Sequence, residues 1–127
     1  MAEYPEDLNY TSDHEWVKTG NDSTVRVGIT AFATEALGDI VFASLPSVGD
    51  EVEAGDSIAE LESTKSVSEV FTPVAGVVCE INEALLDTPE LINDDPYGDG
   101  WLFGVDMSDM TQLDDLLDVN AYTGQLD

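Results

Sequence analysis

Apolar and polar residues alternate along most of this chain, which is the spacing expected of strands with one buried face. In the segment 24–29, for example, Val25, Val27 and Ile29 share one face and are separated by small or polar residues. Turn-forming residues interrupt such runs about every eight to twelve positions, a pattern typical of β-sandwiches and barrels. The pattern predicts strands at 15–19, 24–29, 39–45, 57–62, 67–71, 76–81 and 101–105.

Two short helices are predicted between these strands. Thr30 can cap a helix over residues 31–37, and Gly38 would end it because glycine adopts the left-handed conformation found after helices. Asn82 can cap a second, brief helix that continues through Leu86.

A longer helix is predicted near the C-terminus, beginning with Ser108 as its cap. Four apolar residues of this helix form one stripe: Met110, Leu113, Leu116 and Leu117. Asp118 would then lie near the helix end, where a negative charge opposes the helix dipole. The expected fold is a mainly β single domain of residues 1–127, a sandwich or barrel with short helices and this C-terminal helix packed outside.

Acidic residues outnumber basic ones by 28 to 3, and the net charge is −25. Such a surface repels phosphate backbones and anionic lipid heads, so we expect no nucleic acid and no membrane partner. Neighbouring carboxylates repel each other by about 1 kcal/mol in water, and salt near ~1 M shortens the screening length to about 3 Å and removes most of that cost. The composition therefore predicts a protein from a halophile, and the shared sign of charge favours a monomer.

Several kinds of site are disfavoured by the composition. The chain has no long apolar run and begins with acidic, polar residues, so we expect no membrane span, no signal peptide and a cytoplasmic location. Cys79 is the only cysteine and His14 the only histidine, too few for a zinc site. Cys79 lies in an apolar strand and is expected to be a buried, inert thiol. The segment 93–104 has partial calcium-loop spacing, but Gly104 stands where a bidentate glutamate is required.

Lys65 is one of two lysines and lies in a short break between the strands predicted at 57–62 and 67–71. Its ordinary interpretation is a solvated lysine in a turn. However, Thr64 and Ser66 leave the amine accessible, the flanking strands hold the turn in place, and lysine is otherwise nearly absent. An amine presented in this way can form an amide with a carboxylic cofactor that then moves on a flexible arm between active sites.

Lys65 also lies within one of several short motifs that run through nearly the whole chain. They are E-S-T-K-S-V at 62–67, H-E-W at 14–16, V-G-I-T at 27–30, L-G-D-I-V-F at 37–42, L-P-x-V-G at 45–49, P-V-A-G at 73–76, P-E-L-I-N at 89–93, P-Y-G-x-G-W at 96–101 and L-L at 116–117. In this order they resemble the glycine cleavage system H-protein family, and the first resembles its lipoylation site. Each motif alone is weak, whereas the set is specific.

The resemblance implies a lipoyl-type barrel-sandwich hybrid with lipoate in amide linkage to Lys65. It implies a non-catalytic carrier whose oxidised arm accepts the aminomethyl group of glycine from a pyridoxal-phosphate glycine decarboxylase. An aminomethyltransferase would pass the one-carbon unit to tetrahydrofolate, and dihydrolipoyl dehydrogenase would reoxidise the arm. A lipoate ligase or lipoyltransferase would attach the cofactor. In the family, a glutamate three residues before the lysine and a glycine eleven after it assist that enzyme; here they are Glu62 and Gly76.

The resemblance further implies a surface cleft that holds the loaded arm. Glu15 matches one family position, and Asp13 and Glu69 occupy two others, where some members have a serine and an aspartate. Carboxylates stabilise a protonated amine, and exclusion of water slows its loss. Many members have a histidine where this chain has Phe32, which makes the cleft more apolar. We therefore expect protection of the arm to depend more strongly on Glu15.

Four alternatives are considered. A lipoyl domain of a 2-oxo acid dehydrogenase would use the same lysine, but such domains are shorter and lack the His-Glu-Trp motif and the C-terminal helix. A carrier that relays lipoate to other enzymes is compatible with the same residues. A biotin carrier would normally have methionine on both sides of the lysine, so Thr64 and Ser66 disfavour it. A cofactor-free acidic β-sandwich that serves as an interaction module would leave Lys65 unmodified, which the intact mass would reveal.

Overall fold

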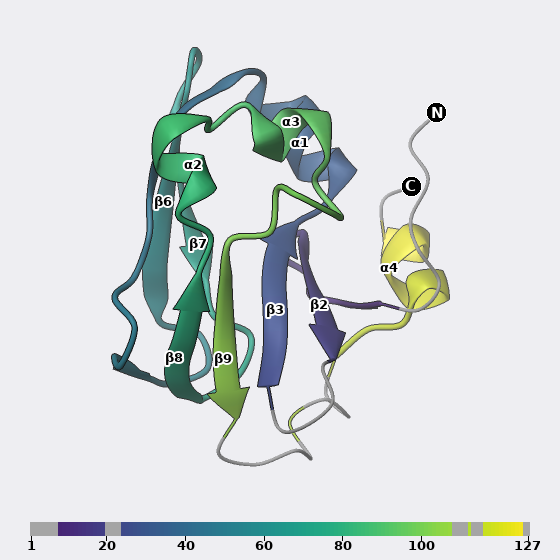
Figure 1. Ribbon diagram of the computed structural model, residues 1–127. Coiled ribbons are helices and arrows are strands. Elements are labelled where there is room, and N and C mark those ends of the chain that lie inside the picture. Colours follow the sequence, from purple (N-terminus) through teal and green to yellow (C-terminus); the bar gives the residue numbers. More distant parts are fainter. Residues whose placement is uncertain (1–7, 20–23, 108–111, 113–115, 126–127) are drawn as a thin grey trace.

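The computed structural model describes residues 8–19, 24–107, 112 and 116–125. Within these residues, nine strands form two antiparallel sheets (Figure 1). The larger sheet has the order β1 (Asn9–Tyr10), β2 (Glu15–Thr19), β3 (Thr24–Ile29), β9 (Phe103–Met107), β8 (Gly76–Ile81) and β5 (Glu51–Val52). The smaller sheet has the order β4 (Ile40–Ser44), β6 (Ser57–Ser63) and β7 (Val67–Phe71). The fold is therefore mainly β, as predicted, and the ladders of these residues do not join into one closed barrel.

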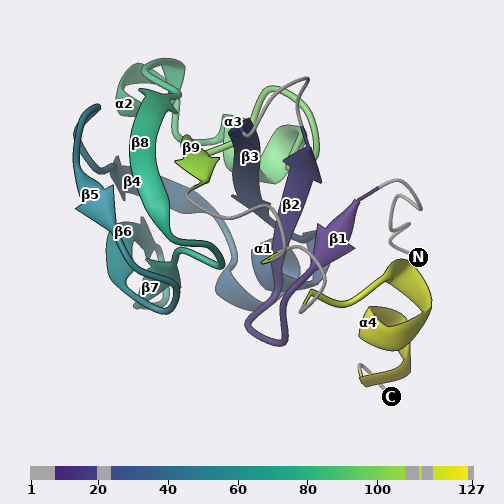
Figure 2. The same cartoon turned by 90° about the horizontal axis from the view of Figure 1, so that it is seen from below.

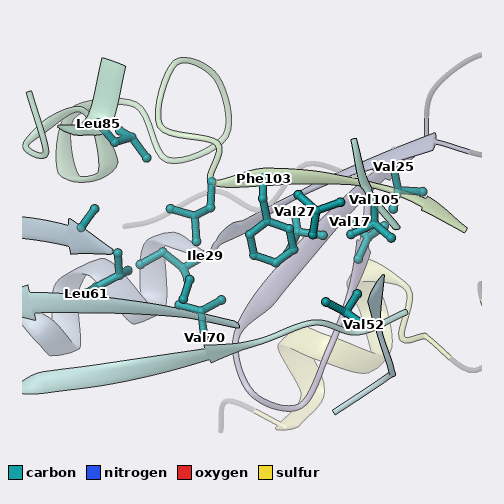
Figure 3. Close-up of a cluster of buried hydrophobic side chains, with 14 of the residues drawn as sticks. Val17, Val25, Val27, Ile29, Val52, Leu61, Val70, Leu85, Phe103 and Val105 are labelled. Carbon is teal, nitrogen blue, oxygen red and sulfur yellow. The ribbon is translucent and has the colours of Figure 1, made fainter. Parts of the chain in front are cut away.

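The core lies between the two sheets. Figure 3 shows side chains of β3 and β9, such as Val27 and Phe103, facing Leu61 of β6 and Val70 of β7. All four are buried. Leu61 and Val70 are each flanked by an exposed glutamate, and Val27 and Phe103 are each flanked by a buried glycine. One face of each sheet therefore supplies the core, as in other sandwiches. Burial of each such side chain contributes about 1.5–3 kcal/mol, which offsets the repulsion among the surface carboxylates.

The first predicted helix is confirmed in detail. α1 spans Ala31–Leu37, and Thr30 Oγ1 accepts a hydrogen bond from the backbone N of Ala33 at 3.4 Å. Gly38 follows with φ of +83° and donates its N–H to Thr34 O. The chain then turns into β4, so the helix is held across the end of the larger sheet next to the start of the smaller one.

Several short elements were not predicted. They are β1, β5 and the one-turn helix α3 (Leu91–Asp94), each too short for a periodic pattern. α2 spans Ala84–Asp87, but Asn82 does not cap it, because its side chain donates to the carbonyls of Asp99 (2.7 Å) and Trp101 (2.8 Å). The last strand spans Phe103–Met107 and not 101–105 as predicted. It continues to Met107, which lies on its buried face together with Val105.

The C-terminal helix lies later in the chain than predicted. The predicted cap, Ser108, and two of the four stripe residues, Met110 and Leu113, fall outside the described residues. Leu117, the last member of that stripe, forms an isolated antiparallel bridge with Tyr10. Helix α4 spans Val119–Gln125 and lies beside β1 at one edge of the larger sheet (Figure 2). None of the helices in the described ranges is long and apolar enough to cross a membrane.

The prediction that Asp118 opposes the dipole of this helix is wrong. Asp118 precedes α4, and its Oδ1 accepts a hydrogen bond from the backbone N of Ala121 at 2.8 Å. A carboxylate at this end satisfies a free helix N–H and is attracted by the positive end of the dipole. The charge therefore stabilises the helix instead of destabilising it.

Two strand irregularities expose residues that the sequence placed inside. The segment at 39–45 was expected to be a buried strand, but the β4–β6 register shifts between Ile40 and Phe42, and both Val41 and Phe42 face solvent. The β8–β9 register shifts next to Cys79, which is exposed and not buried as predicted. Partial desolvation and the nearby carboxylates of Glu80 and Asp106 raise the pKa of the Cys79 thiol. A raised pKa lowers the thiolate fraction, which agrees with the predicted inertness.

Candidate functional site

Lys65 is exposed in the tight turn between β6 and β7, which projects at one end of the molecule (Figure 1). Ser63 organises this turn: its backbone N donates to Ser66 O (2.8 Å), and its Oγ accepts from the backbone N of Lys65 (3.1 Å) and of Ser66 (3.0 Å). Thr64 N donates to Asp39 O at 3.1 Å, which ties the turn to the residue before β4. The lysine is thus presented at a fixed place by a hydrogen-bonded turn.

The side chain of Lys65 rests against Gly38. A Cβ at Gly38 would lie 3.4 Å from Lys65 Cε and 3.8 Å from Nζ, so the methylene chain passes directly over the glycine. Asn93 of α3 holds this segment, because its Nδ2 donates to Gly38 O (2.8 Å) and its Oδ1 accepts from Ile40 N (2.8 Å). The lysine therefore leaves the hairpin toward the C-terminal end of α1.

The four residues predicted to line an arm cleft do line one cleft. Its volume is about 150 Å³, and Asp13, Glu15, Phe32 and Glu69 all border it. Its remaining wall is mostly apolar and consists of His14, Ile29, Ala33, Ala36, Leu37, Leu61, Ser68 and Val70. At about 30 Å³ for each water-sized group, the cleft holds about five such groups. It fits the end of a flexible arm better than a free ligand of the usual pocket size.

Helix α1 brings the cleft and Lys65 close to each other. Leu37, the last residue of α1, borders the cleft, and the next residue, Gly38, contacts Lys65. Glu69, which also borders the cleft, belongs to β7, the strand that follows the lysine turn. The two features, an exposed amine and a small apolar cleft with acidic residues, therefore belong to one continuous region.

Glu15 is a buried carboxyl that links the two sheets. It lies on β2 and is only 3% exposed. Its Oε2 accepts from the backbone N of Phe71 on β7 (2.7 Å), and its Oε1 accepts from Thr11 Oγ1 (3.2 Å). Burial raises the pKa of Glu15 to about 7, although both hydrogen bonds lower it. A carboxylate has about four lone-pair positions, so two remain for a donor in the cleft.

An imidazole lies in the cleft despite the presence of Phe32. The ring of His14 lies over that of Phe32, with centroids 4.5 Å apart and an angle of 30° between the planes. Burial lowers the pKa of His14, so the neutral ring is favoured. The cleft therefore contains an imidazole, although Phe32 makes part of its wall apolar. The sequence motifs did not indicate that His14 borders the cleft.

Tyr122 of α4 supports this wall, and the sequence did not indicate it. Its side chain is fully buried, and its ring stacks on Tyr10 at 4.8 Å. Its Oη lies 2.8 Å from His14 Nδ1 and 2.7 Å from Thr30 Oγ1, and it shares a hydrogen bond with each. The C-terminal helix thereby fixes the ring of His14 and the cap of α1. No local pattern relates Tyr122 to His14, since 108 positions separate them.

Of the two residues expected to assist lipoylation, the structure brings only Glu62 to Lys65. Glu62 lies on the exposed face of β6, three residues before the lysine. Gly76 begins β8, beyond the far end of the β6–β7 hairpin, where Ser57 pairs with Phe71. A Cβ at Gly76 would collide with the backbone of Asp106 and Met107 on β9. Close backbone packing thus gives Gly76 a structural function.

No metal centre is found in the part of the chain that the structure describes, where no group of three His, Cys, Asp or Glu residues converges. In the calcium-like segment, Asp95 Oδ2 accepts a hydrogen bond from the backbone N of Asp99 at 3.0 Å. The loop is therefore held by internal hydrogen bonds. Glu60 is exposed on the outer face of β6.

Known proteins resemble this chain along its length. Residues 8–127 match the family model described as glycine cleavage H-protein. The glycine cleavage system H protein of Mycobacterium avium is 52% identical over 130 residues, covering 99% of this chain and 98% of that protein, and that of Idiomarina loihiensis is 51% identical over 127 residues, covering 100% and 98%. The crystal structure of a glycine cleavage system H protein from Mycobacterium marinum is 46% identical and has a TM-score of 0.87, covering 97% and 98%. The chain therefore belongs to the glycine cleavage H-protein family.

Proposed function

We propose that this protein is the lipoate-bearing shuttle of a glycine cleavage system, with lipoate joined by an amide bond to Lys65 Nζ. The observation that carries the proposal is the placement of an exposed lysine, fixed by the Ser63 turn, next to a small cleft with an apolar wall and acidic residues. Membership of the glycine cleavage H-protein family supports it. Nothing in the structure favours a 2-oxo acid dehydrogenase domain or a lipoate relay over this function.

The residues present fit a lipoyl group. Lys65 Nζ is accessible, and as a free amine it would attack the carbonyl of nucleotide-activated lipoate. The C–N bond forms as the nucleotide leaves with its bonding electrons, and Nζ loses a proton. Once bound, the lipoyl group supplies a disulfide that accepts the aminomethyl group of glycine. Phe32 and Leu37 in the cleft wall would exclude water from the end of the arm.

Acidic residues of the cleft would hold the amine of the cargo. Asp13 and Glu69 border the cleft, and Glu15 lies in its wall with unused lone pairs. A protonated amine beside Glu15 would favour the carboxylate form and lower its pKa, which strengthens the mutual attraction. We expect Glu15→Gln to shorten the lifetime of the loaded arm, measured by release of the aminomethyl group in the absence of folate. Glu60→Gln, on the outer face, is the control, and a lifetime for Glu15→Gln equal to that of the wild type would refute this role.

The partners follow from the proposed carrier function. Glycine decarboxylase with pyridoxal phosphate would load the arm, the aminomethyltransferase with tetrahydrofolate would unload it, and dihydrolipoyl dehydrogenase would reoxidise it. A lipoate ligase or lipoyltransferase would modify Lys65. The chain itself would act as a monomeric, non-catalytic carrier in the cytoplasm, and its charge of −25 would suit a cell with high internal salt.

The test is the intact mass of the protein purified from its native host, with Lys65→Arg as the control. A mass increase of one lipoyl amide that is absent from the control would support the proposal. When it is mixed with glycine decarboxylase, the lipoylated protein should support the release of carbon dioxide from glycine. It should not support the release of carbon dioxide from a 2-oxo acid by a 2-oxo acid dehydrogenase. An unmodified mass, with lipoate and ligase available, would refute the proposal and favour a cofactor-free interaction module. A biotinyl mass would assign the protein to carboxylases.

A further inference from the structure

An exposed apolar patch lies next to Lys65. It consists of Val41, Phe42 and Val67, which are 53%, 52% and 58% exposed. Glu62 lies between Phe42 and Val67, since it pairs with the first across β4–β6 and with the second across β6–β7. Exposed apolar clusters on an otherwise charged surface mark sites of interaction. This chain has a net charge of −25, so such a cluster contrasts with the rest of its sequence.

The patch is produced by a β-bulge. Ile40 pairs with Ser63 and Phe42 with Glu62, so β4 contains one more residue than β6 in this interval. The bulge turns both Val41 and Phe42 outward, where a regular strand would turn one of them into the core. Bulges often redirect side chains near functional sites. Here the redirected residues lie at the same end of the smaller sheet as Lys65.

Carboxylates border the patch on the side away from the lysine. Glu60 and Glu69 are paired directly across β6 and β7, in the part of the ladder that precedes the Glu62–Val67 pair. Two like charges in such a pair destabilise the sheet. The apolar patch thus has Glu62 within it, between Phe42 and Val67, and Glu60 and Glu69 at its border. A partner with an apolar surface and basic side chains would complement it.

We propose that Val41, Phe42 and Val67 form the surface on which the enzyme that acylates Lys65 docks, beside Glu62, for which the family resemblance already implies a part in lipoylation. That enzyme must bring its active site to Nζ, so it covers the strands that flank the turn. Enzymes that act on the far end of the arm have no such requirement. The docking surface of the acylating enzyme would be apolar, with a cationic side chain opposite Glu62. The inference rests on the proposed function, because it requires that Lys65 be lipoylated.

The test measures lipoylation of the full chain by a purified lipoate–protein ligase with lipoate and ATP. We expect Phe42→Ser and Val67→Ser to raise the KM for the carrier at least tenfold and to leave kcat nearly unchanged. Phe42→Leu should retain the wild-type KM, because it keeps an apolar side chain at that position. Val48→Ser is the matched control, since Val48 is 60% exposed in the loop after β4, which runs away from Lys65.

The lipoylation assay and one further measurement separate the possible outcomes. If the wild type is not lipoylated, the proposed function fails. If the wild type is lipoylated and Phe42→Ser and Val67→Ser have its KM, the docking surface fails while the carrier function stands. The rate at which a small acylating reagent, an acetyl ester, modifies Nζ should be equal in the wild type and both variants. A slower reaction in the variants would place the effect in the presentation of Lys65 and overturn the proposal.

Discussion

The buried carboxyl of Glu15 should make the stability of this protein depend on pH. Its ordinary pKa is 4.5, and burial raises it to about 7 in the folded state. Each pKa unit corresponds to about 1.36 kcal/mol, so the difference between the ordinary and the folded-state pKa amounts to about 3 kcal/mol of folding free energy. Because the folded state holds the proton more tightly, this contribution is fully present below pH 4.5 and is lost as the pH rises through 7. Glutamine cannot ionise, so Glu15→Gln removes this pH-dependent contribution to stability.

The assay is urea unfolding of the wild type and Glu15→Gln at a series of pH values from about 4 to 8. Other groups titrate equally in both proteins, so the difference between their free energies of unfolding isolates Glu15. Glutamine replaces one acceptor oxygen by an amide nitrogen, which can weaken the contact with Phe71 N or Thr11 by an amount that does not vary with pH. We expect the wild type to lose about 3 kcal/mol relative to the variant across this range. A difference that stays constant with pH would refute the burial argument.

Three further predictions concern the framework around the site. Tyr122→Phe should lower the free energy of unfolding by about 1–3 kcal/mol in urea titrations, because it removes the partner of His14 Nδ1 and one of the partners of Thr30 Oγ1 while the ring remains stacked; a loss near zero would contradict this. Gly76→Ala should cost about 1–3 kcal/mol through backbone overlap, whereas Gly124→Ala, with open space around it, should be neutral or stabilising. Slower lipoylation of Gly76→Ala without lost stability would indicate a recognition role instead. Finally, raising NaCl to about 1 M should increase the thermal midpoint through screening, and a midpoint unchanged by salt would contradict the proposed adaptation to salt.

The sequence predicts most of the framework because its strands have regular alternation. β2, β3 and α1 begin and end where apolar spacing, the cap of Thr30 and Gly38 place them. Bulges are different, since one extra residue moves a side chain to the other face without changing the composition of the strand. The exposed positions of Phe42 and Cys79 were missed for this reason. The helix at 119–125 was missed because it is only seven residues long and its apolar face consists of Val119 and Tyr122 alone.

The candidate site was predictable only as far as local motifs and family resemblance reach. The turn of Lys65 follows from small residues between two strands, and the resemblance supplied Asp13, Glu15 and Glu69, which the fold gathers around one cleft. The positions of His14 and Tyr122 depend on contacts between opposite ends of the chain. Such contacts are set by tertiary packing, which a single sequence does not display.

The hydrogen bond between His14 and Tyr122 has a consequence for the order of assembly. It closes a loop of 108 residues, and such non-local contacts form late because the chain must first lose much of its freedom. During synthesis, His14 leaves the ribosome long before Tyr122 does. The Lys65 hairpin is local and can form early, whereas the wall of the cleft is complete only when the two ends of the chain meet. Lys65 would thus be ready for modification before the cleft that protects the aminomethyl group is complete.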